Sequence, residues 1–384
     1  SKDEVWFGTD FGLNKFSLKD KKITNFFHEF GNENSISHDV VNCLFQDKQG
    51  NLWVGTNNGV DKIYIPNNNI LFNQTGPNSK QRLGSIEVNS FSEDKQGNIW
   101  FATNQGLLKY DTKKDDYMEY HPPQILHTKV LNILIDKSDN VWIATPGGIN
   151  KLSSRENEIL SFTAREDKEG YLTSNYISDL SLDSKENLWV STHNKGLFLL
   201  PEGKEDGNFI SVNLNNIHSI PFKGIRGLTA DDHGSLWVDS YTNILKLNIQ
   251  TQESEVFSIR EQEPKGLIYN TYYNNNTYWV AALNGIFKWD EDQYTFSKIA
   301  DIGIKINGFV VDNNLIWFTS HSNLYQYNIE DDTLKKIPGY LTQNIKFNRN
   351  GYKDSSGQIY FSSFDGFICF DPKQLSFKTE EQNI

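Results

Sequence analysis

The side chains that could carry chemistry in this sequence are scattered histidines, a repeated aspartate and a few arginines. None of the eight histidines forms an HExxH run or another close metal-ligand spacing, so no metal site is predicted. The chain also lacks a GxSxG nucleophile motif and any glycine-rich phosphate loop between a strand and a helix. We therefore expect a region without catalytic residues, metal or cofactor.

The repeated aspartate stands six residues before an aromatic residue. It occurs as Asp47, Asp94, Asp136, Asp183, Asp231 and Asp354. Paired carboxylates can hydrolyse glycosidic bonds. An aspartate can also accept hydrogen bonds from backbone N–H groups two residues further on and so close a tight turn. The fixed place of this aspartate in each unit predicts the turn.

The aspartate belongs to a unit that recurs nine times. Examples are DKQGNLWVGTNNG (47–59), DKQGNIWFATNQG (94–106) and DKSDNVWIATPGG (136–148). Its aromatic anchors are Trp6, Trp53, Trp100, Trp142, Trp189, Trp237, Trp279, Trp317 and Tyr360. A glycine, or Asn243 and Asn323 in two units, follows each anchor. Glycine and asparagine tolerate positive φ, so we expect a left-handed residue in a hairpin turn there.

Each unit predicts four short strands. The first precedes the aspartate, the second carries the aromatic anchor, the third follows the glycine, and the fourth is short (ILF, YMEY, ILSF). With no helical periodicity between them, such units predict an all-β fold, a β-propeller of four-stranded blades with the Trp rings packed between blades. We expect a seven-bladed ring over 85–384 and blades of a preceding propeller over 1–84. One ring of eight or nine units is the alternative.

Charge and composition exclude several classes of partner. The 384 residues carry a net charge of −12 and no basic cluster, which argues against nucleic acid. The sequence contains no run of 18 apolar residues, so no membrane span is predicted. Cys43 and Cys369 are too few for a disulfide framework, and their apolar, strand-like surroundings predict buried, unpaired thiols.

Candidate ligand-binding residues follow from propeller geometry. The turns between second and third strands open on the same face as the loops between blades, away from the aspartate turns. This face should carry His193, Tyr241 and His321 in its turns. Its longer loops add Arg82, Arg165, Tyr171 and Tyr176. Aromatic rings beside polar side chains suit sugar rings and their hydroxyl or carboxylate groups.

Arg226 and Arg349 form a second set of candidates. They stand five residues before the turn aspartate, in a mostly polar row that should line the central channel near its mouth. A local ion pair or channel water would account for such residues. The functional hypothesis is that they contact a carboxylate or sulfate of a bound oligosaccharide.

The segments DKQGNLWVGTNNGVDKI and DKQGNIWFATNQGLLKYD resemble the two-component regulator propeller repeat, found in the sensor region of hybrid two-component system proteins of Bacteroidetes. The resemblance implies a periplasmic ectodomain of an inner-membrane histidine kinase that binds oligosaccharide fragments and controls glycan-utilisation genes. It implies a preceding propeller, a following immunoglobulin-like domain and a homodimer as partners. The region itself would not be an enzyme. A propeller polysaccharide lyase or glycosidase and a protein-interaction scaffold are the alternatives.

Overall fold

The computed structural model describes residues 4–18, 21–29, 35–46, 52–63, 70–72, 86–114, 116–154, 158–165, 168–193, 195–204, 207–212, 225–259, 267–274, 276–283, 285–337, 345–364, 366–373 and 375. It divides into two compact units. Unit 1 comprises Ser1–Ile70 with Lys373–Ile384, and unit 2 comprises Leu71–Pro372. The elements identified in the described residues are all strands, which confirms the all-β prediction.

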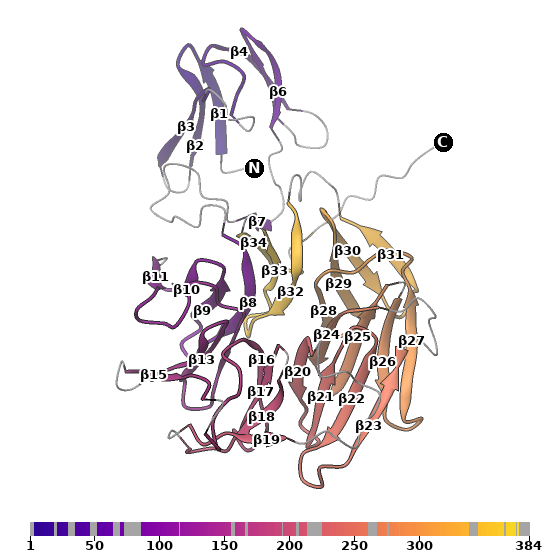
Figure 1. Ribbon diagram of the computed structural model, residues 1–384. Coiled ribbons are helices and arrows are strands. Elements are labelled where there is room, and N and C mark those ends of the chain that lie inside the picture. Colours follow the sequence, from indigo (N-terminus) through magenta and orange to yellow (C-terminus); the bar gives the residue numbers. More distant parts are fainter. Residues whose placement is uncertain are drawn as a thin grey trace. The chain divides into compact units, whose positions relative to one another are not determined.

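Unit 2 is built from seven four-stranded antiparallel sheets (Figure 1). The first three sheets are β8 (Val88–Glu93), β9 (Ile99–Thr103), β10 (Gly106–Asp111), β11 (Asp116–Tyr120); β12 (Asn132–Ile135), β13 (Val141–Thr145), β14 (Gly148–Leu152), β15 (Ile159–Phe162); and β16 (Ile177–Leu182), β17 (Leu188–Thr192), β18 (Gly196–Leu200), β19 (Ile210–Val212). The next two are β20 (Gly227–Ala230), β21 (Ser235–Asp239), β22 (Asn243–Asn248), β23 (Ser254–Ser258); and β24 (Ile268–Asn274), β25 (Thr277–Ala282), β26 (Gly285–Asp290), β27 (Thr295–Asp301). The last two are β28 (Phe309–Asp312), β29 (Leu315–Ser320), β30 (Asn323–Asn328), β31 (Thr333–Lys336); and β32 (Phe347–Lys353), β33 (Ile359–Ser363), β34 (Gly366–Phe370) with β7 (Ile70–Phe72).

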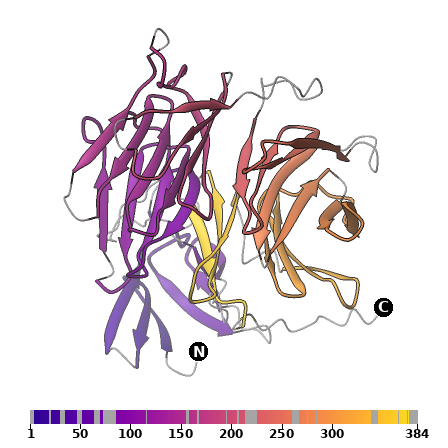
Figure 2. The ribbon, with the colours of Figure 1, turned by 90° about the horizontal axis from the view of Figure 1, so that it is seen from below.

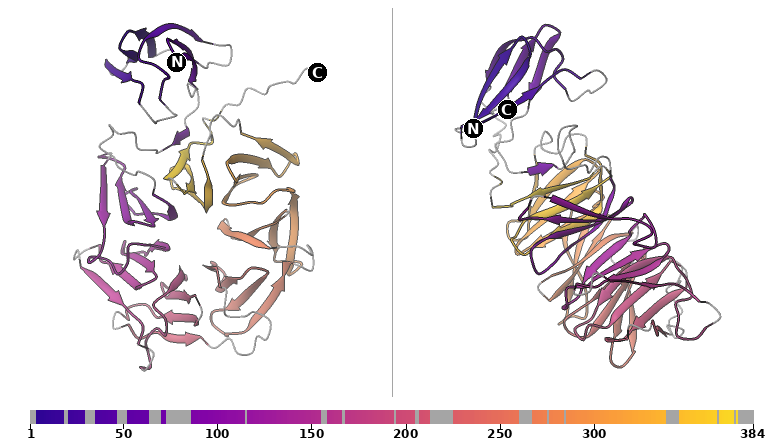
Figure 3. Two further views of the ribbon diagram at one scale, coloured as in Figure 1. Left: turned by 45° about the horizontal axis from the view of Figure 1, so that its top comes forward. Right: turned by 90° about the vertical axis from the view of Figure 1, so that its left-hand side faces the viewer.

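The seven sheets of unit 2 follow one another around a central axis, and the ring closes where the last sheet meets the first (Figure 3, left). Asn348 Nδ2 donates to the Val88 carbonyl at 3.2 Å, and Ser355 N–H donates to Glu93 Oε2 at 2.7 Å. Seen from below, the yellow β32–β34 lie beside the purple β8–β11 (Figure 2). A β-propeller of four-stranded blades is thereby confirmed.

The last sheet takes its fourth strand from the other end of the ring segment. β7 pairs with β34, although it precedes β8 in the chain. Our assignment of ILF (70–72) as the fourth strand of the second unit was therefore wrong. A three-residue strand carries too little pattern to specify which sheet edge it joins.

Unit 1 contains two three-stranded sheets. They are β1 (Glu4–Thr9), β2 (Gly12–Ser17) and β3 (Lys22–Phe26), and β4 (Val41–Gln46), β5 (Leu52–Thr56) and β6 (Gly59–Ile63). Leu13, Ile36, Val41, Leu52 and Val54 form its core. Cys43 is exposed here, so the predicted burial of its thiol was wrong, whereas Cys369 in unit 2 is buried; both thiols are free.

The aromatic anchors of unit 2 lie between neighbouring sheets, as predicted. Trp142 of β13 belongs to one core cluster with Leu180 and Val190 of the next sheet. Trp237 of β21 stacks on Tyr278 of β25, with ring centroids 4.6 Å apart. Trp53 of unit 1 differs, because 36% of its surface is exposed. Burial of such large rings is a main source of stability in thin sheets.

The repeated aspartate closes its turn as predicted and also holds the anchor. Asp183 Oδ1 accepts hydrogen bonds from the backbone N–H of Lys185 at 2.9 Å and of Asn187 at 3.0 Å. Its Oδ2 accepts the indole N–H of Trp189 at 3.1 Å. Asp94, Asp136 and Asp231 make the same bond to their tryptophans. Asp47 lies outside the described residues.

The hairpin turns follow the prediction in some units only. Gly106 and Gly148 have φ of 137° and 129°, which L side chains rarely adopt. Asn243, Asn323 and Gly285 do not have positive φ, so the left-handed assignment was wrong for those units. In the turn before β30 the positive φ belongs to His321, at 51°.

Candidate ligand-binding face

The turns of the ring separate onto two faces. In a four-stranded antiparallel sheet the first and third connections share one end, and the second connection shares the other end with the loop to the next sheet. Consistent with this, the turns of Asp136, Asp183 and Asp231 line one pocket of about 420 Å³. The opposite face, which carries the second-to-third-strand turns, is called the hairpin face below.

Four predicted residues of the hairpin face lie in two contacting pairs, each of which includes a tyrosine ring. The His193 ring lies 4.9 Å from the Tyr176 ring, and its backbone N–H donates to the Tyr176 carbonyl at 3.0 Å. The Arg165 guanidinium lies 4.7 Å from the centre of the Tyr171 ring. The loop before β16 supplies Arg165, Tyr171 and Tyr176, so this loop and the β17–β18 turn gather four of the residues named from sequence.

Arg226 and Tyr241 are also in contact. The Arg226 guanidinium lies 4.9 Å from the centre of the Tyr241 ring, and its Nη1 donates to the Ile268 carbonyl at 2.7 Å. Arg226 is half-buried, whereas Tyr241 is 57% exposed. Arg226 therefore joins the sheets of β20 and β24 while Tyr241 presents an aromatic surface to solvent.

Asp239 lies beside this pair and was not among the residues predicted from sequence. Its carboxylate is buried and accepts a hydrogen bond from Thr271 Oγ1 at 3.3 Å. Burial raises the pKa of Asp239 to about 6, although the positive charge of Arg226 opposes the rise. The segment WVDSYTN did signal this residue, because Asp239 stands where other units carry glycine, alanine, serine or threonine.

Asp179 is a second buried carboxylate near the channel. Its oxygens accept the backbone N–H of Leu228 at 2.8 Å and of Leu180 at 2.9 Å, and it also accepts Asn132 Nδ2. Burial raises the pKa of Asp179 to about 7, and the negative charge of Asp239 adds to the rise. Perturbed carboxylates of this kind occur at functional sites and in structural networks alike.

Asp179 belongs to a belt of hydrogen bonds that joins the innermost strands. Asn89 Nδ2 donates to the Val130 carbonyl at 2.8 Å, and Asn307 Nδ2 donates to the Phe347 carbonyl at 3.1 Å. The other links are Asn132 to Asp179, Leu228 to Asp179, Arg226 to Ile268, Asn270 to Asn307 and Asn348 to Val88. The polar row that the sequence places in the channel is thus partly used to connect blades.

The remaining predicted residues are less clustered. His321 is exposed, with its Nδ1 3.3 Å from Ser320 Oγ. Arg349 is exposed, and its backbone carbonyl accepts a hydrogen bond from Asn270 Nδ2. Arg82 lies outside the described residues. The binding role of these three residues stays a prediction.

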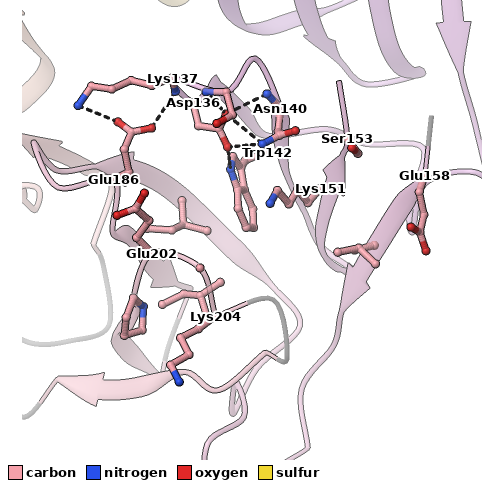
Figure 4. A pocket seen from close by; sticks show the side chains of 16 residues that line it. Asp136, Lys137, Asn140, Trp142, Lys151, Ser153, Glu158, Glu186, Glu202 and Lys204 are labelled. Atoms are coloured by element: carbon pink, nitrogen blue, oxygen red, sulfur yellow. Dashed lines mark hydrogen bonds and ion pairs between the residues drawn. The ribbon is translucent and has the colours of Figure 1, made fainter. Parts of the chain in front are cut away.

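A larger pocket, of about 580 Å³, lies on the aspartate-turn side between the second and third sheets of unit 2 (Figure 4). Its charged side chains are of both signs, as in the Lys137–Glu186 ion pair at 3.3 Å. The Trp142 indole points to the Asp136 carboxylate and is buried. With no aromatic surface free to stack among its described residues, this pocket is a weaker candidate than the hairpin face.

Metal-binding and membrane-spanning features are not found in the described residues. This part of the chain holds no group of three or more histidine, cysteine, aspartate or glutamate side chains that could bind a metal ion. Among the same residues, no helix has the length and hydropathy needed to cross a membrane.

The sequence matches a known family in three places. Residues 35–58, 82–105 and 171–194 match the two-component regulator propeller family. These three segments are similar to two-component regulator propeller repeats. The third match runs from the loop that holds Tyr171 to the β17–β18 turn, and so includes the Asp183 turn and Trp189. No protein of curated function matches the chain.

Solved structures of similar fold agree with the repeat. The extracellular domain of the hybrid two component system BT3049 from B. thetaiotaomicron is 19% identical, with a TM-score of 0.75, over 97% of this chain and 50% of that one. The extracellular domain of the hybrid two component system BT4673 from the same organism is 22% identical, with a TM-score of 0.67, over 96% and 51%. This repeat chain therefore spans about half the length of these relatives, and at such identity the likeness shows the fold.

An enzyme also shares the fold. Virginiamycin B lyase from Staphylococcus aureus, solved in a catalytically inactive form with quinupristin, is 13% identical, with a TM-score of 0.61, over 75% of this chain and 96% of that one. The fold is thus shared by extracellular domains of two component systems and by a lyase, so the fold alone does not decide the function.

Proposed function

We propose that this propeller is the ligand-sensing region of a two-component system receptor, lies in the periplasm, and binds an oligosaccharide on its hairpin face. The family of its repeats supports this, as do similar structures that are extracellular domains of two component systems. The observation that carries the ligand class is the Arg226–Tyr241 pair, in which an exposed ring lies beside a fixed cation. Sugars use both, through stacking of C–H surfaces and hydrogen bonds to oxygens.

The rest of the receptor is part of the same proposal. A histidine kinase, a further propeller, an immunoglobulin-like domain and homodimerisation would convert binding into control of glycan-utilisation genes. A ligand can act only by favouring one arrangement of the receptor over another. The region described would itself be non-catalytic.

Calorimetric titration of the protein with a panel of neutral and acidic oligosaccharides tests the proposal. We expect saturable, one-site binding by at least one class, and loss of that binding in Tyr241→Ala. Tyr294→Ala is the matched control, because Tyr294 is an exposed ring (47%) that lies after β26, in a turn of the opposite face. If no oligosaccharide binds, the proposed ligand class is wrong.

A polysaccharide lyase or glycosidase is the second candidate. The likeness to virginiamycin B lyase and the buried carboxylates Asp179 and Asp239 favour it. Incubation with a polysaccharide panel, followed by assay for new reducing ends and unsaturated products, distinguishes it from a receptor. Capture of a protein partner by the hairpin face, without sugar binding, would instead indicate an interaction scaffold.

A further inference from the structure

Arg226 has a counter-charge, and among the described residues its side chain donates a single hydrogen bond. A guanidinium carries five N–H donors, and one of those of Arg226 serves the Ile268 carbonyl. The backbone N–H of Arg226 donates to the Asp239 carbonyl at 2.9 Å, and the positive charge of Arg226 lowers the pKa of the Asp239 carboxyl group. Within the described residues, no hydrogen bond joins the guanidinium to that carboxylate. Asp239 therefore balances the charge of Arg226 and leaves guanidinium donors available beside Tyr241.

A second anion at Arg226 would take over the role of Asp239. The carboxylate of Asp239 would then be a buried charge without compensation, which is costly in a low-dielectric surrounding. Asp179 also interacts with Asp239, and the interaction of the two negative charges is unfavourable. Protonation of Asp239 would remove the cost.

The surroundings of Asp239 can accommodate the protonated form. Thr271 Oγ1 already contacts its Oδ1 at 3.3 Å. Tyr278 is buried, its hydroxyl has no hydrogen-bond partner among the described residues, and burial together with the charge of Asp239 raises the pKa of that hydroxyl. A protonated carboxyl group has an O–H to donate, and a hydroxyl without a partner can accept it. Asp239 interacts with charged and hydroxyl groups of four neighbouring segments. They are Asp179 of β16, Arg226 just before β20, Thr271 of β24 and Tyr278 of β25.

We propose that Arg226, beside Tyr241, binds the carboxylate of an acidic sugar, and that Asp239 takes up one proton from solvent when the sugar binds. This inference rests on the proposed function and adds the class of ligand and its coupling to pH. No covalent bond forms or breaks. The hairpin face would thus select uronate-containing oligosaccharides over neutral ones, and more strongly in acid than in base.

Calorimetry with trigalacturonate as the probe, and maltotriose as the neutral control, tests the coupling. Titrations at pH 6.5 in two buffers of different ionisation enthalpy give the number of protons exchanged. We expect uptake of most of one proton per trigalacturonate and no exchange with maltotriose. Because Asp239 would change from partly ionised to protonated, affinity should rise about tenfold from pH 7.5 to pH 5.5.

Two variants separate Asp239 from other proton acceptors. Asp239→Asn should bind trigalacturonate without proton uptake and with nearly the same affinity at pH 7.5 and pH 5.5. If this variant does not fold, Asp239→Ser is the substitute, since serine occupies the matching position of β17 as Ser191. Arg226→Gln should lose trigalacturonate binding at every pH.

The outcomes are distinct. Proton uptake that persists in Asp239→Asn, or trigalacturonate binding without uptake, overturns the coupling and leaves the proposed receptor function intact. Binding of maltotriose but not of trigalacturonate overturns the ligand class alone. Failure of both sugars and of the full panel contradicts the proposed function itself.

Discussion

In the fourth sheet of the ring, the Asp239 carboxylate occupies the space that a side chain at Gly227 would need. They are cross-strand partners, and a Cβ atom on Gly227 would lie 2.2 Å from Asp239 Oδ1. In the next sheet the large polar residue stands on the first strand and the small one on the second, as in Asn270 opposite Ala281. The fourth sheet reverses this order, so its glycine is required by close approach.

Gly227→Ala should therefore destabilise the ring. We expect a loss of about 1–3 kcal/mol, as for other overpacked sites, because the carboxylate must move. Urea denaturation measures it. In an Asp239→Ala background the same change should cost much less, since the carboxylate is gone. An equal loss in both backgrounds would show that the contact is not the cause.

Asp183 should contribute more to the free energy of unfolding than an exposed aspartate does. Asp183→Ala removes the acceptor of two backbone N–H groups and of the Trp189 indole, which is fully buried. An unsatisfied buried donor costs about 1–3 kcal/mol, so we expect a loss of about 3 kcal/mol in the free energy of unfolding. Asp292→Ala, at an exposed position, is the control and should change it by less than about 0.5 kcal/mol.

Asp239 should also make stability depend on pH. Its pKa in the folded protein, about 6, is higher than its usual value in an unfolded chain, so the folded state binds the proton more tightly. This contribution to stability is present below the unfolded pKa of about 4 and is lost as pH rises through about 6. As pH rises from 4.5 to 7.5, the free energy of unfolding should fall in both proteins. The fall should be about 1–3 kcal/mol smaller in Asp239→Asn than in the parent protein.

Chemical denaturation of both proteins at the two pH values measures this difference. Asp292→Asn, which removes a carboxylate at an exposed position, should behave as the parent protein does. Parallel pH profiles of the Asp239→Asn variant and the parent would contradict the prediction.

Tyr241→Phe and Tyr241→Leu address how the exposed ring acts. If sugar rings stack on it, Tyr241→Phe should keep affinity within about threefold, and Tyr241→Leu should lose about 1–2 kcal/mol of binding free energy. Calorimetry gives both values, with thermal unfolding as a check on folding. Equal losses in the two variants would show that the hydroxyl group, rather than the ring, makes the contact.

Much of the fold could be predicted because the same strand-and-turn pattern recurs in nine units of the sequence. An Asp–Trp pair six residues apart specifies a turn and an anchor together, and the structure joins them by a direct hydrogen bond. β7 could not be placed, because three apolar residues fit any free sheet edge. The positive φ of His321 was missed because residue type alone biases φ without deciding it.

The candidate site was only partly predictable. Arg226 and Tyr241 were both predicted, from different arguments, and the structure brings them together. Asp239 was not predicted, although the segment WVDSYTN departs from the other units at that position. Its contact with Arg226 and its fit against Gly227 depend on two strands being paired, which composition and spacing do not show.

The pairing of β7 with β34 has a consequence for how the chain is made. During synthesis β7 leaves the ribosome before every strand of the ring, and its partner sheet, β32–β34, leaves last. At about 5–20 residues per second, the wait is on the order of tens of seconds. For that time a nascent protein would hold a ring without its closing sheet, with open strand edges that favour association with other chains. Pairing of β7 with β34 would then end this exposure and close the ring.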